Sequence, residues 1–299
     1  MNSSKYCILF NPLSGNGKGR GEAEALAQRV DATSCVDMTA LESYSDFFAE
    51  HTDENIIICG GDGTLNRFVN DTADISFQNS IFYCASGSGN DFLRDIEGKV
   101  GEVICIDKYV KDLPVCTIDG KDYKFIDGIG FGIDGYCCQV GDELRARNDG
   151  KAINYTGIAI KGLLFHYKPT DATVTVDGVS HRFKKVWIAP TMLGRYYGGG
   201  MMAAPAQDRF NSDGTLSAML FHGTGRLRTL MIFPSIFKGE HVKSEKAVAV
   251  LTGREITVEF DEPRPLQVDG ETILGVKKYT VRSGALLKEK TAEAEKASI

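Results

Sequence analysis

The chain has 299 residues, of which 42% are hydrophobic and 25% are charged, and its formal net charge is −6. This length suffices for two domains that each bury a core, and the negative charge excludes a nucleic-acid binder held by a broad basic face. The most apolar run, residues 230–237, is short and contains a proline, so we expect no transmembrane segment. The N-terminus runs into a strand pattern and the cysteines form no CxxC pair. We therefore expect a cytoplasmic protein without signal peptide, zinc or disulfide framework.

The first third of the chain alternates strand and helix patterns. Strands are predicted at 6–10, 34–38, 55–59 and 80–84, and helices at 22–30, 45–51 and 64–70, the helix at 45–51 opening with a capping serine. This βαβα alternation predicts a Rossmann-like parallel sheet covered by helices, with ligands bound at the carboxyl ends of the strands.

From about residue 107 the pattern changes to hairpins. Asp119-Gly120 and Asp177-Gly178 each separate two strand-like runs, at 115–118 and 123–126 and at 173–176 and 180–183. Further strands are predicted at 185–189, 215–221, 255–260, 265–268 and 278–282, with a helical stretch near 152–167. We expect an α/β domain over 1–108 and an antiparallel β-sandwich over 109–284. The tail, 285–299, is a final helix or disordered, and its return to the first domain stays open.

A glycine-rich turn at Gly60-Gly61-Asp62-Gly63-Thr64 joins the strand at 55–59 to the following helix. Such a turn lets backbone N–H groups approach a phosphate, and the helix N-terminus adds partial positive charge. An aspartate there makes sense if it holds a cation beside the phosphates or takes a proton from an attacking hydroxyl. The alternative is a turn chosen only for its left-handed backbone.

Two more turns of this kind follow the first and fourth predicted strands. Asn11 to Arg20 is rich in glycine and supplies a hydroxyl from Ser14 and the cations Lys18 and Arg20, a combination that suits a polyphosphate. Ala85 to Arg94 offers Ser88 and Asn90 to a nucleotide and Arg94 to a phosphate; alternatively it is a helix start capped by Asn90 or Asp91. Three such turns on one parallel sheet are expected to converge on one crevice.

Together these turns resemble the diacylglycerol kinase catalytic domain, which bacterial soluble lipid kinases share with sphingosine and ceramide kinases. The resemblance continues through the second half of the chain and covers nearly all of it, on Gly130-Phe131-Gly132-Ile133-Asp134, Tyr197-Gly198-Gly199-Gly200-Met201, Asp213-Gly214-Thr215-Leu216 and Val268-Asp269-Gly270-Glu271. The Gly-Gly-Asp-Gly-Thr element alone is shared with NAD kinases and, more loosely, phosphofructokinases, whereas the ordered set is specific.

The resemblance implies a phosphofructokinase-like nucleotide-binding domain, a β-sandwich domain and catalysis in the cleft between them. It implies ATP and Mg²⁺, with Asp62 catalytic and beside the metal, Glu271 as general base and Asp134 at the lipid headgroup. A second, structural Mg²⁺ is implied at Asp213, with Asp208 and the carbonyl of Leu216 as further ligands. The implied nucleotide-binding residues are Asn11, Ser14, Gly15, Lys18, Arg20, Gly60, Gly61, Gly63, Thr64, Asn66, Gly87, Ser88, Gly89, Asn90 and Arg94.

The chain departs from the family pattern at three places. The segment Pro205–Asp213 is longer than the common version, which leaves the partner of Asp213 open. Residues 85–89 stand where many members have Pro-x-Gly-Thr, and their serine keeps a hydroxyl there. Two residues after Asp134 the chain has Tyr136 and Cys137, where soluble members carry a small residue and an acid. Asp269-Gly270 and Asp213-Gly214 are also ordinary turn signals, so Glu271 as a plain strand residue and Asp213 as a plain turn residue stay open.

The expected function is transfer of the γ-phosphoryl group of ATP to a lipid hydroxyl, that of diacylglycerol, which gives phosphatidic acid. The alternatives are an NAD kinase-like small-molecule kinase and a non-catalytic lipid or nucleotide sensor. The apolar stretch 153–167 lines an acyl groove, lies on the membrane interface or simply packs on the sandwich. Membrane contact is expected to be peripheral, at the inner membrane surface, and weak because the net charge is negative. A homodimer stays open.

Overall fold

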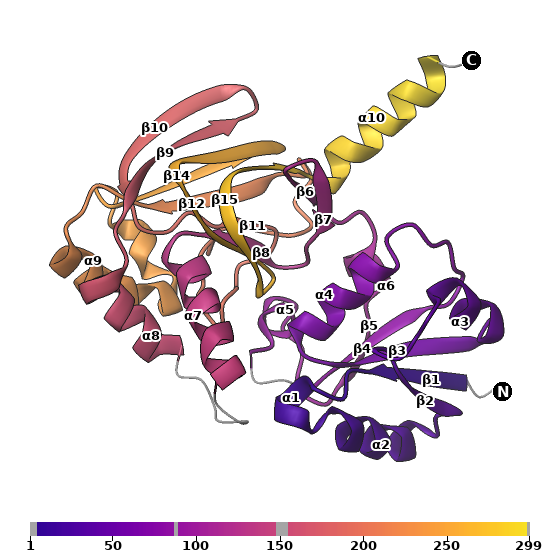
Figure 1. The fold of residues 1–299 in the computed structure, drawn as a ribbon. Helices are drawn as coiled ribbons and strands as arrows, with labels where there is room; N and C mark the ends of the chain where they lie inside the picture. Colours follow the sequence, from indigo (N-terminus) through magenta and orange to yellow (C-terminus); the bar gives the residue numbers. More distant parts are fainter. Residues whose placement is uncertain (1–4, 87–88, 148–154, 298–299) are drawn as a thin grey trace. The chain divides into compact units, whose positions relative to one another are not determined.

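The computed structural model describes residues 5–86, 89–147 and 155–297. Its internal contacts divide the chain into two compact units, Met1–Lys111 and Asp112–Ile299, whose elements are labelled in Figure 1. Among the helices of the described residues, none combines the length and the apolar character that crossing a bilayer requires.

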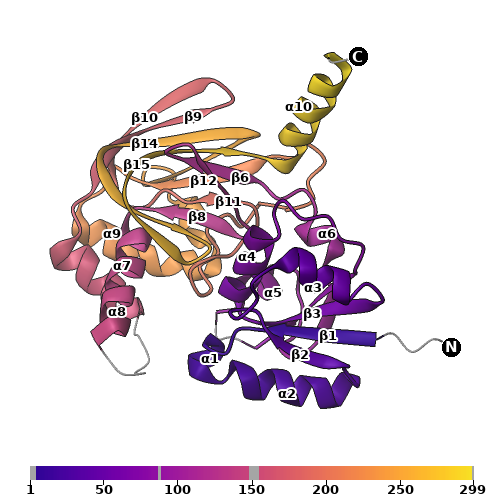
Figure 2. The same cartoon turned by 45° about the vertical axis from the view of Figure 1, so that its right-hand side comes forward.

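The first unit is a sheet of five strands in the order β2-β1-β3-β4-β5 with helices around it (Figure 2). The strands are β1 Lys5–Phe10, β2 Ser34–Asp37, β3 Glu54–Gly60, β4 Ile81–Ala85 and β5 Val103–Cys105. The helices are α1 Ser14–Gly17, α2 Gly19–Val30, α3 Tyr44–Glu50, α4 Asp62–Asp71, α5 Asp91–Asp95 and α6 Asp107–Val110. The central strands β1 and β3 carry apolar runs where both faces are covered, and Ile56, Ile57 and Ile58 are fully buried.

Two details of this unit correct the sequence-based prediction. The strands β1 to β4 pair in parallel as expected, but β5 pairs antiparallel with β4 at the sheet edge. A strand of three residues is too short to give a periodic pattern, which is why the sequence does not reveal it. The helix α3 is capped by Ser43, whose hydroxyl accepts from the N–H of Asp46 at 3.2 Å, so it begins earlier than predicted and carries buried Tyr44 in its first turn.

The second unit is an antiparallel β-sandwich. Its strands are β6 Val115–Ile118, β7 Lys121–Lys124, β8 Gly128–Phe131, β9 Thr170–Val176, β10 Val179–Val186, β11 Thr191–Met192, β12 Leu216–Phe221, β13 Val248–Gly253, β14 Glu255–Val268 and β15 Glu271–Arg282. Both predicted hairpins, β6–β7 and β9–β10, are confirmed. The strands predicted at 255–260 and 265–268 are one long strand, β14.

The bulged strand β14 links the layers of the sandwich. Its first half pairs with β9 and its second half with β8, and the register shifts between Glu259 and Leu266. Such bulges let one strand pass from one layer to the next, around a shared apolar core.

The helical segments of this unit are α7 Ile133–Arg147, α8 Tyr155–Lys161, the π-helical turn η1 Gly162–His166, α9 Arg226–Ile232, the 3₁₀ segments η2 Phe233–Lys238 and η3 Glu240–Lys243, and α10 Gly284–Ala297. The predicted helical stretch near 152–167 is confirmed over 155–166, while residues 152–154 lie outside the described part. The sequence does not reveal the helix α7, because it mixes glycine, cysteine and charged residues. Ion pairs of α10 with Arg254, Glu255 and Asp112 tie the tail to this second unit.

Candidate active site

The turn after β1 is wound tightly around the carbonyl of Asn11. That carbonyl accepts from the N–H of Ser14 at 3.0 Å and from its hydroxyl at 2.8 Å, while the side-chain oxygen of Asn11 accepts from the N–H of Leu13 at 2.9 Å. A Cβ at Gly19 would clash with both Asn11 and Ser14, so this position requires glycine. Gly15 has a φ of +57°, and the exposed Lys18 ends the helix α1 that begins at Ser14.

Arg20 is the second cation that follows the turn after β1. Its guanidinium lies 5.2 Å from the centre of the Phe10 ring and 3.9 Å from the carboxylate of Asp37. The side chain is mostly exposed. Lys18 and Arg20 therefore remain accessible to an anion beside β1.

The turn after β3 packs against its own helix. A Cβ at Gly60 would clash with the side chain of Thr64, which is buried, and the N–H groups of Thr64 and Leu65 donate to the carbonyl of Gly61 at 3.0 and 3.2 Å. At Gly63 a Cβ would meet nothing within 4 Å. The tight approach at Gly60 fixes where α4 starts and hence where its first residue, Asp62, projects.

Asp62 joins the turn after β3 to the turn after β4. Its Oδ2 accepts from the N–H of Asp91 at 2.7 Å, and its Oδ1 is 3.4 Å from the N–H of Phe92. The aspartate thus caps α5, whose own first flanking residue, Asn90, makes no side-chain cap bond and has a φ of +48°. A Cβ at Gly89 would lie 3.6 Å from Oδ2. The structure therefore places a carboxylate among backbone N–H groups at the carboxyl ends of β3 and β4.

The remaining residues predicted for the nucleotide lie on the helices α4 and α5 or outside the described part. Gly87 and Ser88 fall outside the described residues. Arg94 pairs with Asp91 at 3.4 Å and is half exposed, whereas Asn66 is buried and accepts from the amide of Asn70 at 3.3 Å.

In the second unit Asp134 is buried in the first turn of α7. Its Oδ1 accepts from the N–H of Gly135 at 2.9 Å and its Oδ2 from the hydroxyl of Tyr197 at 3.1 Å. Burial raises the pKa of Asp134 to about 6, against the lowering effect of these hydrogen bonds. A Cβ at Gly130 would clash with Asp134 and Gln267, so the glycine of β8 makes room for both side chains.

Glu271 follows a two-residue turn that is held firmly in place. Asp269 and Gly270 have φ of +44° and +95°, the pattern of a type I′ hairpin turn between β14 and β15. The carboxylate of Asp269 accepts from the N–H groups of Ile126, Asp127 and Gly128 at 2.6, 3.0 and 2.9 Å.

The position of Glu271 follows from this turn and from its neighbour. The N–H of Gly270 donates to Gln267 at 2.6 Å, and Thr272 donates to Asp142 of α7 at 2.7 Å. Glu271 itself is exposed. It therefore stands on a fixed turn beside the helix that carries Asp134 in its first turn.

The loop before β12 carries Asp208 and Asp213, and side-chain amides close it. The amide nitrogen of Asn211 donates to the carbonyls of Asp208 and Thr215 at 2.7 and 2.9 Å, and that of Gln207 donates to the same two carbonyls at 3.3 and 3.0 Å. The carboxylate of Asp208 accepts from the N–H of Phe210 at 2.9 Å. The carbonyls of Asp208 and Thr215 in this loop are thus engaged by side-chain amides.

The other two predicted ligands at this loop lie nearby in sequence. Asp213 is exposed and accepts from Ser212 at 3.2 Å, and Leu216 opens β12 in register with Gly253. In the described part of the chain, the one group of three His, Cys, Asp or Glu side chains close enough to share an ion is Cys7, His51 and Glu54. Burial raises the pKa of the Cys7 thiol to about 11, which disfavours the thiolate that a metal would need.

Several residues of these sites are not evident from the sequence. Arg209 forms a buried ion pair with Asp127 at 3.2 Å and donates to the carbonyl of Ile126 at 3.0 Å, which anchors the loop to the segment before β8. Tyr197 and Asp269 lie in motifs that the sequence singles out, but their partners Asp134 and residues 126–128 are distant in sequence, so the motifs alone do not reveal what the two side chains do.

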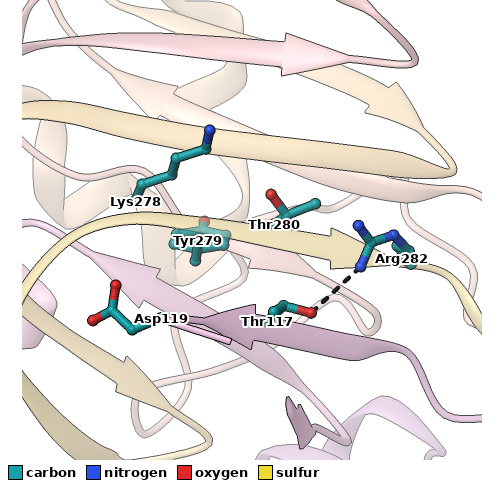
Figure 3. Close-up of a pocket in the computed structure, with 6 residues that line it drawn as sticks. All are labelled: Thr117, Asp119, Lys278, Tyr279, Thr280 and Arg282. Carbon is teal, nitrogen blue, oxygen red and sulfur yellow. Dashed lines mark hydrogen bonds between the residues drawn. The ribbon is translucent and has the colours of Figure 1, made fainter. Parts of the chain in front are cut away.

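A shallow hollow of about 200 Å³ lies elsewhere, on β6 and β15 (Figure 3). Arg282 at its rim donates to Glu255 at 2.9 Å and lies 3.4 Å from the hydroxyl of Thr117. The hydroxyl of Tyr279 is turned into the core, where it meets Thr191 at 2.9 Å. None of the predicted site residues lines this hollow.

Comparisons with known proteins match both units. Residues 5–113 match the diacylglycerol kinase catalytic domain and residues 128–286 match the YegS C-terminal NAD kinase beta sandwich-like domain. A diacylglycerol kinase of Mycobacterium tuberculosis is 26% identical over 275 residues, covering 87% of this chain and 85% of the relative. One from Bacillus subtilis is 21% identical over 278 residues, covering 88% of each chain.

A solved structure shares the fold. A diacylglycerol kinase from Bacillus anthracis aligns over 94% of both chains with a TM-score of 0.57 and 17% sequence identity. The two-domain architecture expected from the sequence is therefore confirmed.

The chain belongs to the diacylglycerol kinase family, as the match over both of its units shows. Membership makes it a phosphotransferase with an alcohol group as acceptor, and the family implies ATP as the phosphoryl donor.

Proposed function

We propose that this chain transfers the γ-phosphoryl group of ATP to the hydroxyl of diacylglycerol and so forms phosphatidic acid. The observation that carries the proposal is the Asp62 carboxylate, held by the N–H of Asp91 where two glycine-rich turns meet. Phosphoryl transfer needs positioning and neutralisation of charge more than covalent chemistry by the protein. A fixed carboxylate beside glycine-rich turns would supply the positioning, and it would bind the cation that neutralises the charge.

The turns after β1, β3 and β4 would bind the nucleotide. Their backbone N–H groups suit phosphate oxygens, and the exposed Lys18 and Arg20 supply positive charge next to the first turn. Because the side chain of Arg20 is only loosely paired with Asp37, at 3.9 Å, it keeps the freedom to reach an anion.

The Asp62 site fits Mg²⁺, because this hard cation prefers oxygen ligands and the Asp62 carboxylate is fixed by the N–H of Asp91 at the ends of β3 and β4. The ion would supply charge neutralisation on the phosphates. Asp62, held in place by its hydrogen bond to the first turn of α5, would be the residue that binds this ion. The loop at Asp208 fits a cation poorly, since amide nitrogens already engage its carbonyls.

Glu271 and Asp134 would serve the acceptor. Glu271 is exposed on a rigid turn, so its carboxylate can take the proton of the attacking hydroxyl. Asp134, ionised above its pKa of about 6, would recognise the headgroup of the acceptor, while the hydrogen bond from Tyr197 orients its carboxylate. Such an acceptor lies in a bilayer, so the chain would act peripherally at the inner membrane surface.

Transfer of label from γ-labelled ATP to a mixed-micelle panel tests the proposal. The panel holds diacylglycerol, monoacylglycerol, sphingosine, ceramide and undecaprenol, with NAD as soluble control. We expect labelled phosphatidic acid and an unlabelled NAD fraction. Label on NAD alone, or no product with any lipid while ATP still binds, would contradict it.

A further inference from the structure

Large apolar side chains are exposed on the helical side of the second unit. Phe165 of η1, Leu227 of α9 and Met231 of α9 are 72%, 73% and 76% exposed. Leu227 and Met231 stand four residues apart and so share one face of their helix. The opposite side of the same elements, with Leu163 and Leu230, packs into the core of this unit. The helices are therefore anchored inside while their outer face stays apolar.

These side chains come from neighbouring elements. Arg226, at the start of α9, donates to the carbonyl of Leu163 in η1 at 2.7 Å, and α9 also contacts η2. Figure 1 shows α8 and α9 side by side on one flank of the second unit. Phe237, 45% exposed, lies on η2, which follows α9 directly in the chain and contacts it. We call Phe165, Leu227, Met231 and Phe237 the docking face.

The elements that carry the docking face have a charge of opposite sign to that of the whole chain. The chain has 40 acidic and 34 basic residues, yet α8, η1, α9 and η2 contain no Asp or Glu. They contain Lys161, Arg226, Arg228 and Lys238. Lys161 stands one helical turn before Phe165, and Arg228 and Lys238 follow Leu227 and Phe237 directly. Each exposed apolar side chain thus has a cation close to it in sequence.

We propose that the docking face rests on the surface of an anionic lipid bilayer. Apolar side chains enter the interface while neighbouring Lys and Arg bind the acidic headgroups, each reinforcing the other. A second copy of this chain is a poorer occupant, because a two-fold contact through this face would bring cations against cations. The proposal rests on the proposed function, in which the acceptor is a membrane lipid.

The net charge of −6 leads to the expectation of weak membrane contact, but it does not decide the attraction at this face. Charges farther from the bilayer than a Debye length, about 8 Å at physiological salt, are largely screened. The local excess of cations at the docking face therefore decides the attraction, and the acidic remainder of the chain contributes little.

Co-sedimentation with vesicles tests the docking face without any catalysis. One vesicle set holds phosphatidylcholine and phosphatidylglycerol in equal parts, and the other holds phosphatidylcholine alone. We expect the full chain to bind the anionic set more tightly. Combined Leu227→Ser and Met231→Ser should weaken binding about tenfold or more, since two large apolar side chains no longer enter the interface. Combined Lys161→Glu and Arg228→Glu should abolish the preference for the anionic set.

The matched control combines Val179→Ser and Val250→Ser, which removes two exposed apolar side chains, 60% and 43% exposed, from strands of the same unit. It should bind like the wild type, and circular dichroism checks that every variant is folded. Absent binding to anionic vesicles, or equal binding by the Leu227 and Met231 variant, would overturn the proposal. If sedimentation velocity shows a wild-type dimer, and the Leu227 and Met231 variant is a monomer, the docking face serves self-association instead. The docking-face variants should still phosphorylate a dispersed short-chain diacylglycerol, which needs no bilayer. This assay tests the kinase proposal separately from the docking face.

Discussion

A single buried carboxyl, Asp134, shows how the fold changes the chemistry of one residue. Burial raises its pKa from 3.8 to about 6, whereas the bonds from Gly135 and Tyr197 lower it. The native state therefore binds a proton that the unfolded chain has already released in the pH range between these values. It follows that the contribution of Asp134 to stability is greatest below pH 3.8 and is lost as the pH rises through about 6.

The variant Asp134→Asn is expected to lose this pH dependence. The difference in stability across the window is on the order of 2–3 kcal/mol, because each unit of pKa shift corresponds to about 1.4 kcal/mol. Chemical denaturation at several pH values measures it. A wild type and variant whose stabilities run parallel from pH 4 to 7 would rule out the raised pKa.

The loop before β12 gives a prediction at the scale of one element. Amides of Asn211 and Gln207 close it, so a chelator should leave the melting temperature of the protein unchanged. Asn211→Ala should lower the stability by roughly 2 kcal/mol, since two carbonyls and the N–H of Thr215 lose a partner. Thermal melts with and without EDTA show whether a bound cation stabilises this loop. A melting temperature that falls with EDTA, and no longer does so in Asp213→Ala, would instead establish a structural cation.

The turn between β14 and β15 gives a second prediction at this scale. Asp269→Ala removes the acceptor of three backbone N–H groups and should destabilise the second unit by about 3 kcal/mol. Turnover should fall as well, because the same turn carries Glu271. Asp119→Ala is the control, since Asp119 occupies the same left-handed position, φ +48°, in the β6–β7 turn. If both variants lose the same stability, the effect of Asp269→Ala comes from the left-handed backbone position and not from the three hydrogen bonds.

Sequence patterns predict the elements with strong local signals. The hairpins at Asp119-Gly120 and Asp177-Gly178 and the strands β1, β3 and β4 follow from turn chemistry and apolar runs. The antiparallel β5, the cap of α3 and the helix α7 do not, because short strands and glycine-containing helices carry weak periodicity. The contacts of Asp62 with Asp91, Tyr197 with Asp134 and Asp269 with Ile126 span 29, 63 and 143 residues. Such long-range pairs depend on the folded topology and cannot be read from a local pattern.

At the scale of the whole molecule, two matched domain families make the chain a lipid-kinase relative. Its net charge of −6 describes the molecule poorly, because the acid-free helical segments α8, η1, α9 and η2 carry a local positive charge. The distribution of charge, rather than its sum, decides what such a protein can approach.

The measurement that tests the account most directly is the rate of label transfer from γ-labelled ATP to a dispersed short-chain diacylglycerol. Three proteins are compared: the wild type, Asp62→Asn and Asp71→Asn. The amide introduced by Asp62→Asn keeps an oxygen for the N–H of Asp91 but loses the charge, whereas Asp71 is an aspartate on the same helix that pairs with Arg67 at 3.2 Å. We expect labelled phosphatidic acid from the wild type and Asp71→Asn, and a rate lower by about 100-fold or more from Asp62→Asn. Equal rates from all three proteins, or ATP consumption without a lipid product, would contradict the account.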